Sequence, residues 1–69
     1  MMSVSAPDLS PRMREAMRWV MLGKSDAEMG RLMGVSTATA HFHVEGAKAK
    51  LDVGSRTYAA AILFLAGRL

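Results

Sequence analysis

Apolar residues recur at three- and four-residue spacing along the chain, and the first such stretch begins at a strong helix start. The Ser10 hydroxyl can accept from an unpaired backbone N–H, and Pro11 at the first helical position has no N–H to lose. This helix is expected to reach about Leu22 and to stop at Gly23. Its predicted inward stripe is Met13, Ala16, Met17, Val20 and Met21. Trp19 lies beside that stripe, and we expect it to close the core rather than stack on a base.

The next two stretches predict a pair of helices joined by a tight turn. Ser25 and Glu28 have the spacing of a capping box, in which the hydroxyl and the carboxylate each bond the other residue's backbone N–H. The short helix that follows presents an expected apolar face of Met29, Leu32 and Met33. Gly34 supplies a left-handed end, and Ser36 is a good N-cap for a longer helix over residues 37 to 51. This order is typical of a helix-turn-helix.

The longer helix has two unlike faces. Its expected inward face is Ala40, Val44, Ala47 and Leu51, with His43 as a neighbour. The opposite side carries Thr37, Ala38, His41, Phe42, Glu45 and Lys48, a mixture that includes an aromatic ring with no evident core to join. Asp52 and Gly54 are expected to break the helix, since Asp tolerates a left-handed backbone.

A fourth helix is expected from the cap Ser55 to the closing Gly67, and it is apolar nearly all round. Its predicted inward stripe is Ala59, Ile62, Leu63 and Ala66, which leaves Ala60, Ala61, Phe64 and Leu65 toward water. A helix apolar on every side is usually buried on every side, and so small a unit cannot bury it alone. The outward side is therefore a candidate self-association surface, or simply an exposed helix of alanines.

Composition narrows the possibilities. A chain of 69 residues holds one small domain, and without Cys it has neither disulfides nor thiolate metal sites, so oligomerisation is the remaining source of extra stability. The net charge of +3 suits a polyanion but does not by itself indicate nucleic acid. Residues 1–8 read as a disordered lead-in without a secretory signal. The longest apolar run, residues 58 to 66, is too short to cross a bilayer, so a cytoplasmic protein without membrane contact is expected.

The sequence gives little support for catalysis or for metal binding. The serines sit at helix caps, and His41 and His43 lie on different faces of one helix, unlike the four-residue spacing that puts two metal ligands on one face. Seven Met residues could suggest copper, but Met13, Met17 and Met21 at intervals of four are more simply core filler. We expect no enzyme, no metal, no cofactor and no small-molecule ligand.

Several short motifs appear in a specific order over nearly the whole chain, from Leu9 to Leu69. They are LSPR with Glu15, GKS with Glu28, MGVS with Thr39 and His43, then KL, and SRT with Ala59. In this order they resemble the LuxR-type (GerE-like) helix-turn-helix domain found at the C-terminus of many bacterial transcription regulators. The segment HFHVEGAKAKL looks most similar to quorum-sensing members of that family.

The resemblance implies an all-α, compact four-helix bundle over residues 9–69, with the third helix in the DNA major groove and the fourth forming a dimer on an inverted-repeat site. The base-reading positions it implies are Thr37, Ala38, His41, Phe42 and Glu45. The phosphate positions are Lys24, Ser25, Thr39, Lys48 and Lys50. The dimer positions are Tyr58, Ala61, Phe64 and Leu65. Glu45 departs from the usual basic or polar reading face and would repel phosphates unless it accepts from a cytosine amino group.

Two functions follow as hypotheses. In the first, the chain binds double-stranded DNA sequence-specifically in bacterial transcription regulation, either alone or as part of a longer regulator. In the second, it is a sensor-less LuxR-like interaction module that forms a heterodimer with a full-length regulator through the fourth helix and modulates it. The weakly basic reading face beside a very apolar fourth helix motivates the second hypothesis.

Overall fold

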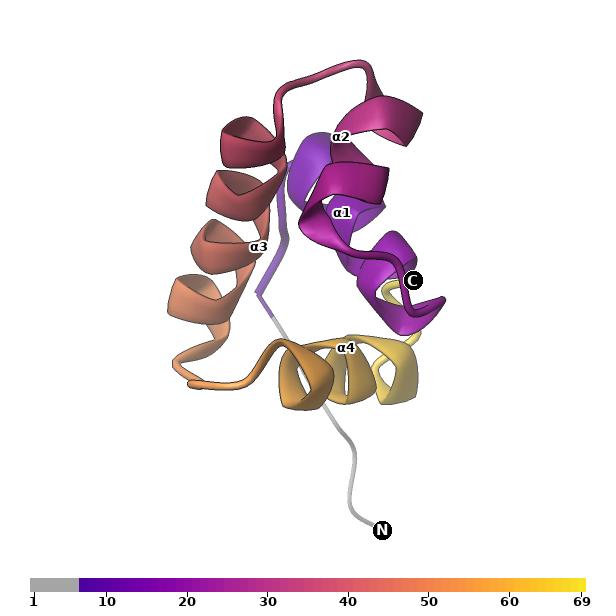
Figure 1. Cartoon of the computed structure of the whole chain (residues 1–69). Helices are drawn as coiled ribbons and strands as arrows, with labels where there is room; N and C mark the ends of the chain where they lie inside the picture. The colour runs from indigo at the N-terminus through magenta and orange to yellow at the C-terminus, as the bar shows by residue number, and fades with distance from the viewer. Residues whose placement is uncertain (1–6) are drawn as a thin grey trace, which may run out of the picture.

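Four helices make up the part of the chain that the computed structural model describes, residues 7–69. They are α1 (Pro11–Met21), α2 (Asp26–Met33), α3 (Thr37–Leu51) and α4 (Arg56–Leu65). Figure 1 shows α2 and α3 joined by the turn at one end of the molecule, with α4 running across the opposite end. The all-α prediction is confirmed. The predicted lead-in falls largely outside the described residues, of which Pro7 and Asp8 are exposed.

All four helices begin at the serines that the sequence predicts. The hydroxyl oxygen of Ser10 accepts from the Met13 backbone N–H at 3.1 Å, and the same arrangement occurs at the other three caps. The capping box is complete, because the Ser25 N–H also donates to the Glu28 carboxylate at 2.9 Å. These bonds satisfy donors that a helix N-terminus otherwise leaves unpaired. The starts of α1 to α4 are therefore local properties of the sequence.

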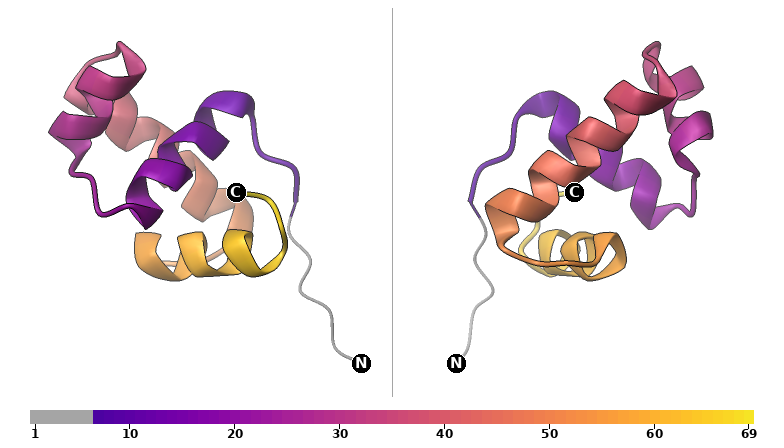
Figure 2. Two further views of the ribbon diagram at one scale, coloured as in Figure 1. Left: turned by 90° about the vertical axis from the view of Figure 1, so that its right-hand side faces the viewer. Right: turned by 60° about the vertical axis from the view of Figure 1, so that its left-hand side comes forward.

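Every helix contributes one of the largest fully buried side chains, so the core lies where the four helices meet (Figure 2). These side chains are Met17, Met29, Val44 and Leu63. The predicted inward face of α3 is confirmed, with Ala40, Val44 and Ala47 fully buried. Trp19 packs against this core, as expected.

Three burial predictions are wrong. Met21 is 44% exposed and Leu32 is 50% exposed, although each was placed on an apolar face. Ala60 was placed toward water and is only 4% exposed. Helix α4 packs against both α1 and α3, so its buried side is turned to include Ala60 with Ala59 and Leu63. Periodicity gives the width of an apolar face but not the neighbour that covers it.

The turn between α2 and α3 depends on two glycines. Gly34 has φ +70°, a left-handed conformation that favours glycine, as predicted. Gly30 is buried, and a Cβ there would lie 2.8 Å from the Val35 carbonyl oxygen. The Val35 N–H also donates to the Gly30 carbonyl at 2.8 Å. The chain thus folds back tightly against α2 and fixes where α3 begins.

Candidate nucleic-acid interface

One side of α3 is open to solvent while the other side forms the core. The open side, here called the outer face of α3, consists of Thr37, Ala38, His41, Phe42 and Glu45, and all of these residues are exposed. Phe42 is 68% exposed, and its ring forms a T-shaped pair with the ring of His43, with centroids 6.1 Å apart. Phe42 is one of two phenylalanines exposed on the described surface, and it is the one on the outer face of α3.

His41 is tied to two other helices through one carboxylate. Its Nδ1 lies 2.8 Å from Asp26 Oδ2 at the start of α2. Arg56, the first residue of α4, donates to both oxygens of the same carboxylate, at 2.6 Å and 3.3 Å. The hydrogen bond from Arg56, followed by that from His41, holds the pKa of Asp26 below its ordinary value despite partial burial. Asp26 therefore joins α2, α3 and α4 at the outer face of α3.

Glu45 and Lys48 neutralise each other on α3. The ammonium of Lys48 lies 2.7 Å from Glu45 Oε2, and this hydrogen bond lowers the pKa of Glu45. The other carboxylate oxygen lies 3.9 Å from Nε2 of His41, beyond hydrogen-bond distance. In the free protein Lys48 thus gives one of its three N–H donors to a carboxylate, which offsets part of its positive charge.

The remaining phosphate candidates lie at the starts of α2 and α3 and at the end of α3. The hydroxyl oxygens of Ser25 and Thr39 accept bonds from within their own caps, which leaves each hydroxyl hydrogen able to donate outward. Lys24 is half-buried, and within residues 7–69 its ammonium makes no hydrogen bond or ion pair, although its charge helps to lower the pKa of Glu28 after the bonds from Ser25. Lys50 is exposed and makes one long contact, 3.5 Å from its ammonium to the Asp8 carbonyl.

A second open surface lies on α4. The outer face of α4, defined as Tyr58, Ala61, Phe64 and Leu65, is exposed throughout, with Phe64 at 60%. An open apolar groove of about 350 Å³ adjoins it. Its lining is Val20, Met21, Thr57, Ala60, Ala61 and Phe64. The exposed Met21 extends this apolar surface onto α1.

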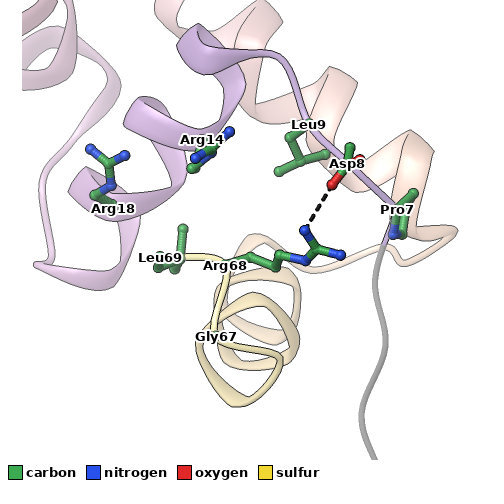
Figure 3. A pocket seen from close by; sticks show the side chains of 8 residues that line it. All are labelled: Pro7, Asp8, Leu9, Arg14, Arg18, Gly67, Arg68 and Leu69. Carbon is green, nitrogen blue, oxygen red and sulfur yellow. Dashed lines mark hydrogen bonds and ion pairs between the residues drawn. The ribbon is translucent and has the colours of Figure 1, made fainter.

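The polar cavity in Figure 3 lies away from both outer faces. It has a volume of about 530 Å³ and lies between the start of the described chain, α1 and the segment after α4. Arg68 donates to the Asp8 carboxylate across it at 2.8 Å. Arg14 and Arg18 line its α1 side and have no side-chain partner within residues 7–69. Both arginines belong to α1, so removing them leaves the cations of α3 in place.

Within residues 7–69, no three His, Asp or Glu side chains gather closely enough to hold a metal ion. The helices of that same part of the chain are too short or too polar to cross a membrane.

The sequence of the chain was also compared with known families. Residues 7–63 match the family described as bacterial regulatory proteins, luxR family (GerE). The chain belongs to the luxR family. This family's domain is a DNA-binding helix-turn-helix of transcription regulators, which is not an enzyme class.

Curated relatives carry the same domain within longer chains. The transcriptional activator protein AnoR of Acinetobacter nosocomialis is 36% identical over 61 residues, covering 88% of this chain and 26% of AnoR. The transcriptional activator protein LuxR of Aliivibrio fischeri is 31% identical over 62 residues, covering 90% and 25%. The quorum sensing-dependent transcriptional regulator VjbR of Brucella ovis is 34% identical over 53 residues, covering 77% and 20%. The luxR-family chain described here therefore spans about a quarter or less of these relatives.

Sequence reasoning missed Asp26 and Arg56. Each is the first residue of its helix, and their side chains meet although 30 positions separate them. Periodicity along one helix carries no signal for such a contact. The available hint was charge, since the two residues have opposite charges and each directly follows a capping serine.

Proposed function

We propose that the chain binds double-stranded DNA sequence-specifically in bacterial transcription regulation, with α3 in the major groove. The observation that carries this proposal is the division of α3 into a buried face and an outer face of five exposed residues. A helix fits the major groove, where the base edges present distinct patterns of donors, acceptors and methyl groups. Family membership supports the same role for the helix-turn-helix.

The outer face of α3 has side chains suited to base edges rather than to phosphates. Phe42 offers an exposed apolar ring that fits the methyl group of thymine. Glu45 is an acceptor suited to the amino group of cytosine, and its pairing with Lys48 reduces the repulsion that a bare carboxylate would meet. Thr37 and Ala38, in the first turn, are small enough to let the helix approach the bases closely.

Contacts to phosphates would surround that face. We propose Lys24, Ser25 and Thr39 at the helix starts, and Lys48 and Lys50 near the end of α3, as the phosphate-binding residues. Backbone N–H groups at helix N-termini and Lys side chains commonly position a protein on phosphates without reading sequence. The modest net charge of +3 means that few cations contribute, so each one should matter.

We further propose that two chains associate through the outer face of α4 on an inverted-repeat site. The exposed Tyr58, Phe64 and Leu65 and the adjoining groove form a continuous apolar surface. Two copies of one surface related by a twofold axis cover each other and match a palindromic site. A location in the bacterial cytoplasm and a part in quorum sensing follow as proposals from the DNA-binding role and from relatives such as VjbR.

The test is fluorescence anisotropy of labelled inverted-repeat duplexes selected from a random library. The paired change Lys48→Ala with Lys50→Ala removes two cations from α3. The matched control, Arg14→Ala with Arg18→Ala, removes two cations from the polar cavity instead. Each lost phosphate contact should reduce the salt slope by about 0.9, so the α3 variant should lose about 2 per chain and the control should not. Equal loss in both variants would contradict the assignment of phosphate contacts to α3.

The alternative function remains a heterodimeric modulator of a full-length regulator. The observation that favours it is the pairing of Lys48 with Glu45, which leaves α3 little free positive charge, beside the open apolar surface of α4. In a pull-down with a full-length relative, this function predicts that Lys48→Ala with Lys50→Ala has no effect and that Phe64→Glu abolishes capture. Capture that survives Phe64→Glu counts against it.

A further inference from the structure

The Asp26 carboxylate determines how the ring of His41 can bond. Arg56 donates to both of its oxygens, at 2.6 Å and 3.3 Å, so the carboxylate is held in place from the α4 side. Its Oδ2 lies 2.8 Å from Nδ1 of His41, a good hydrogen-bond distance. Asp26 is also less exposed than His41, at 23% against 52% of the side chain. The Nδ1 edge of the ring thus faces the more buried side of the contact.

The direction of this hydrogen bond follows from the charges. The neighbouring Arg56 lowers the pKa of Asp26, so the carboxyl is ionised at neutral pH. An ionised carboxylate can only accept, so Nδ1 of His41 carries the hydrogen and donates to Asp26 at 2.8 Å. The Arg56 guanidinium can only donate and lies 3.5 Å from the same nitrogen, so it is the more distant neighbour and bonds the carboxylate instead. In a neutral imidazole the hydrogen on one nitrogen leaves the other as an acceptor, and the bond made by the first nitrogen selects the tautomer.

Nε2 of His41 is left without a hydrogen bond. The nearest charged oxygen, Glu45 Oε1, is 3.9 Å away, and Lys48 engages the other oxygen of that carboxylate at 2.7 Å. About half of the His41 side chain is exposed, on the outer face of α3. The groups facing this ring are Asp26 from α2, Arg56 from α4, and Glu45 and Lys48 from α3. Only Nε2 can therefore meet a ligand on that face.

We propose that Asp26, supported by Arg56, is a positioning residue that presents Nε2 of His41 to DNA as a hydrogen-bond acceptor. The base that suits this acceptor has an exocyclic amino group in the major groove, either adenine N6 or cytosine N4. This inference rests on the proposed function and adds the base class that His41 selects. Without Asp26 the ring is free to place its hydrogen on Nε2, which would suit the acceptors of guanine instead.

The positioning role is tested in the free protein, without DNA, by nitrogen-15 NMR of the histidine rings. The nitrogen-15 chemical shifts of each ring are recorded over a range of pH. They reach a plateau where that ring is neutral, and the shifts at this plateau are the ones compared. We expect the hydrogen of neutral His41 on Nδ1 in the wild type and mainly on Nε2 in Asp26→Ala. Asp26→Asn keeps the shape but offers both a donor and an acceptor, so a mixture is expected. The matched control is Glu15→Ala, which removes a carboxylate that pairs with Arg12 on α1.

The base contact is tested by selecting binding sites from a random duplex library with each folded variant. One position of the wild-type site should prefer adenine or cytosine, and Asp26→Ala should reduce that preference by about 2- to 12-fold, the range of a single hydrogen bond. Glu15→Ala should leave it unchanged.

The NMR experiment and the site selection can each contradict a different part of the proposal. A wild-type His41 with its hydrogen on Nε2, or a tautomer unchanged in Asp26→Ala, overturns the positioning role whatever the DNA result. The expected tautomers together with an unchanged base preference overturn the base contact. A wild-type chain that enriches no site contradicts the proposed function, and with it the base contact, while the NMR result still decides the positioning role.

Discussion

The outer faces of α3 and α4 differ in whether their side chains already have hydrogen-bond partners in the free protein. On α3, His41 is bonded to Asp26 and Glu45 to Lys48, so the polar groups have defined directions before any ligand arrives. On α4, Phe64 and Leu65 are exposed with no polar partner to orient them, beside an open groove. Hydrogen bonds are directional and the hydrophobic effect is not. The first surface is therefore suited to distinguishing ligands, and the second to burying area.

The two faces also depend on different parts of the chain. The position of α3 is set by the close approach of Gly30 to the turn, which is local, and by the Asp26 contact, which joins α2 to α3. The outer face of α4 follows from a short apolar helix whose other side is buried by α1 and α3. Substitutions on the outer face of α4 should thus leave the outer face of α3 able to bind DNA, and the converse should also hold.

The largest expected effect comes from charging the outer face of α4. Phe64→Glu should weaken binding to a duplex with two half-sites by about 100-fold or more, because a central apolar contact is lost and a carboxylate would be buried. Binding to a single half-site should change little. The matched control is Leu32→Glu, which charges an apolar residue on α2 that is 50% exposed, against 60% for Phe64. Equal losses for both variants on both duplexes would show that charge alone, and not the α4 surface, is responsible.

Gly30→Ala should have the second largest effect, because the new Cβ would lie 2.8 Å from the Val35 carbonyl oxygen. We expect a loss of about 2 kcal/mol in the free energy of unfolding, the middle of the range for overpacking. Gly46→Ala on α3 is the control, since there a Cβ meets only the flexible end of the Met13 side chain. Urea titration compares the two. The account of the turn is wrong if the Gly46 variant is the less stable one.

Phe42→Ala should remove one base contact without affecting dimer formation. We expect about a tenfold loss, or about 1.4 kcal/mol, in affinity for the selected site, and no change on a duplex of random sequence. Sedimentation should give the same oligomeric state as the wild type. An equal loss of affinity on both duplexes would mean that Phe42 does not read sequence.

The smallest expected effect is on the stability of the fold at acidic pH. Because the folded pKa of Asp26 is lower than its unfolded value near 3.8, its pairing stabilises the fold above that pH. The stabilisation is lost as the pH falls through the folded value. Asp26→Asn should therefore be less stable than the wild type at pH 7, by less than about 1 kcal/mol, and the gap should narrow at an acidic pH below 3.8. Urea titrations at both pH values measure the gap, and a gap that stays constant would exclude the ionised contact as its source.

The sequence predicts where the helices begin and end better than it predicts which helices pack against one another. Ser10, Ser25, Ser36 and Ser55 start the helices where expected, and Gly34 and Asp52 end two of them, because caps act within a few residues. The burial of Ala60 and the exposure of Met21 and Leu32 depend on which neighbour covers each face, which no single helix encodes. The same reason hides the Asp26–Arg56 contact and the close approach at Gly30.

For the candidate interface, sequence predicts the exposed stripe of α3 but not its internal bonding. The spacing of Thr37, Ala38, His41, Phe42 and Glu45 is enough to place them on one face, and all five are exposed. Their roles on DNA stay predictions. That Lys48 is engaged by Glu45, and His41 by Asp26, emerges only from side-chain geometry.

The central claim is that α3 reads DNA as one half of a dimer formed through α4, and the most direct test is the stoichiometry and salt dependence of binding to an inverted repeat. If Lys24, Lys48 and Lys50 of each chain neutralise one phosphate apiece, two chains give a slope of log K against log salt of about −5. We expect two chains per duplex with a slope near that value. A folded chain that fails to bind at low salt, or that binds singly regardless of the repeat, would contradict it.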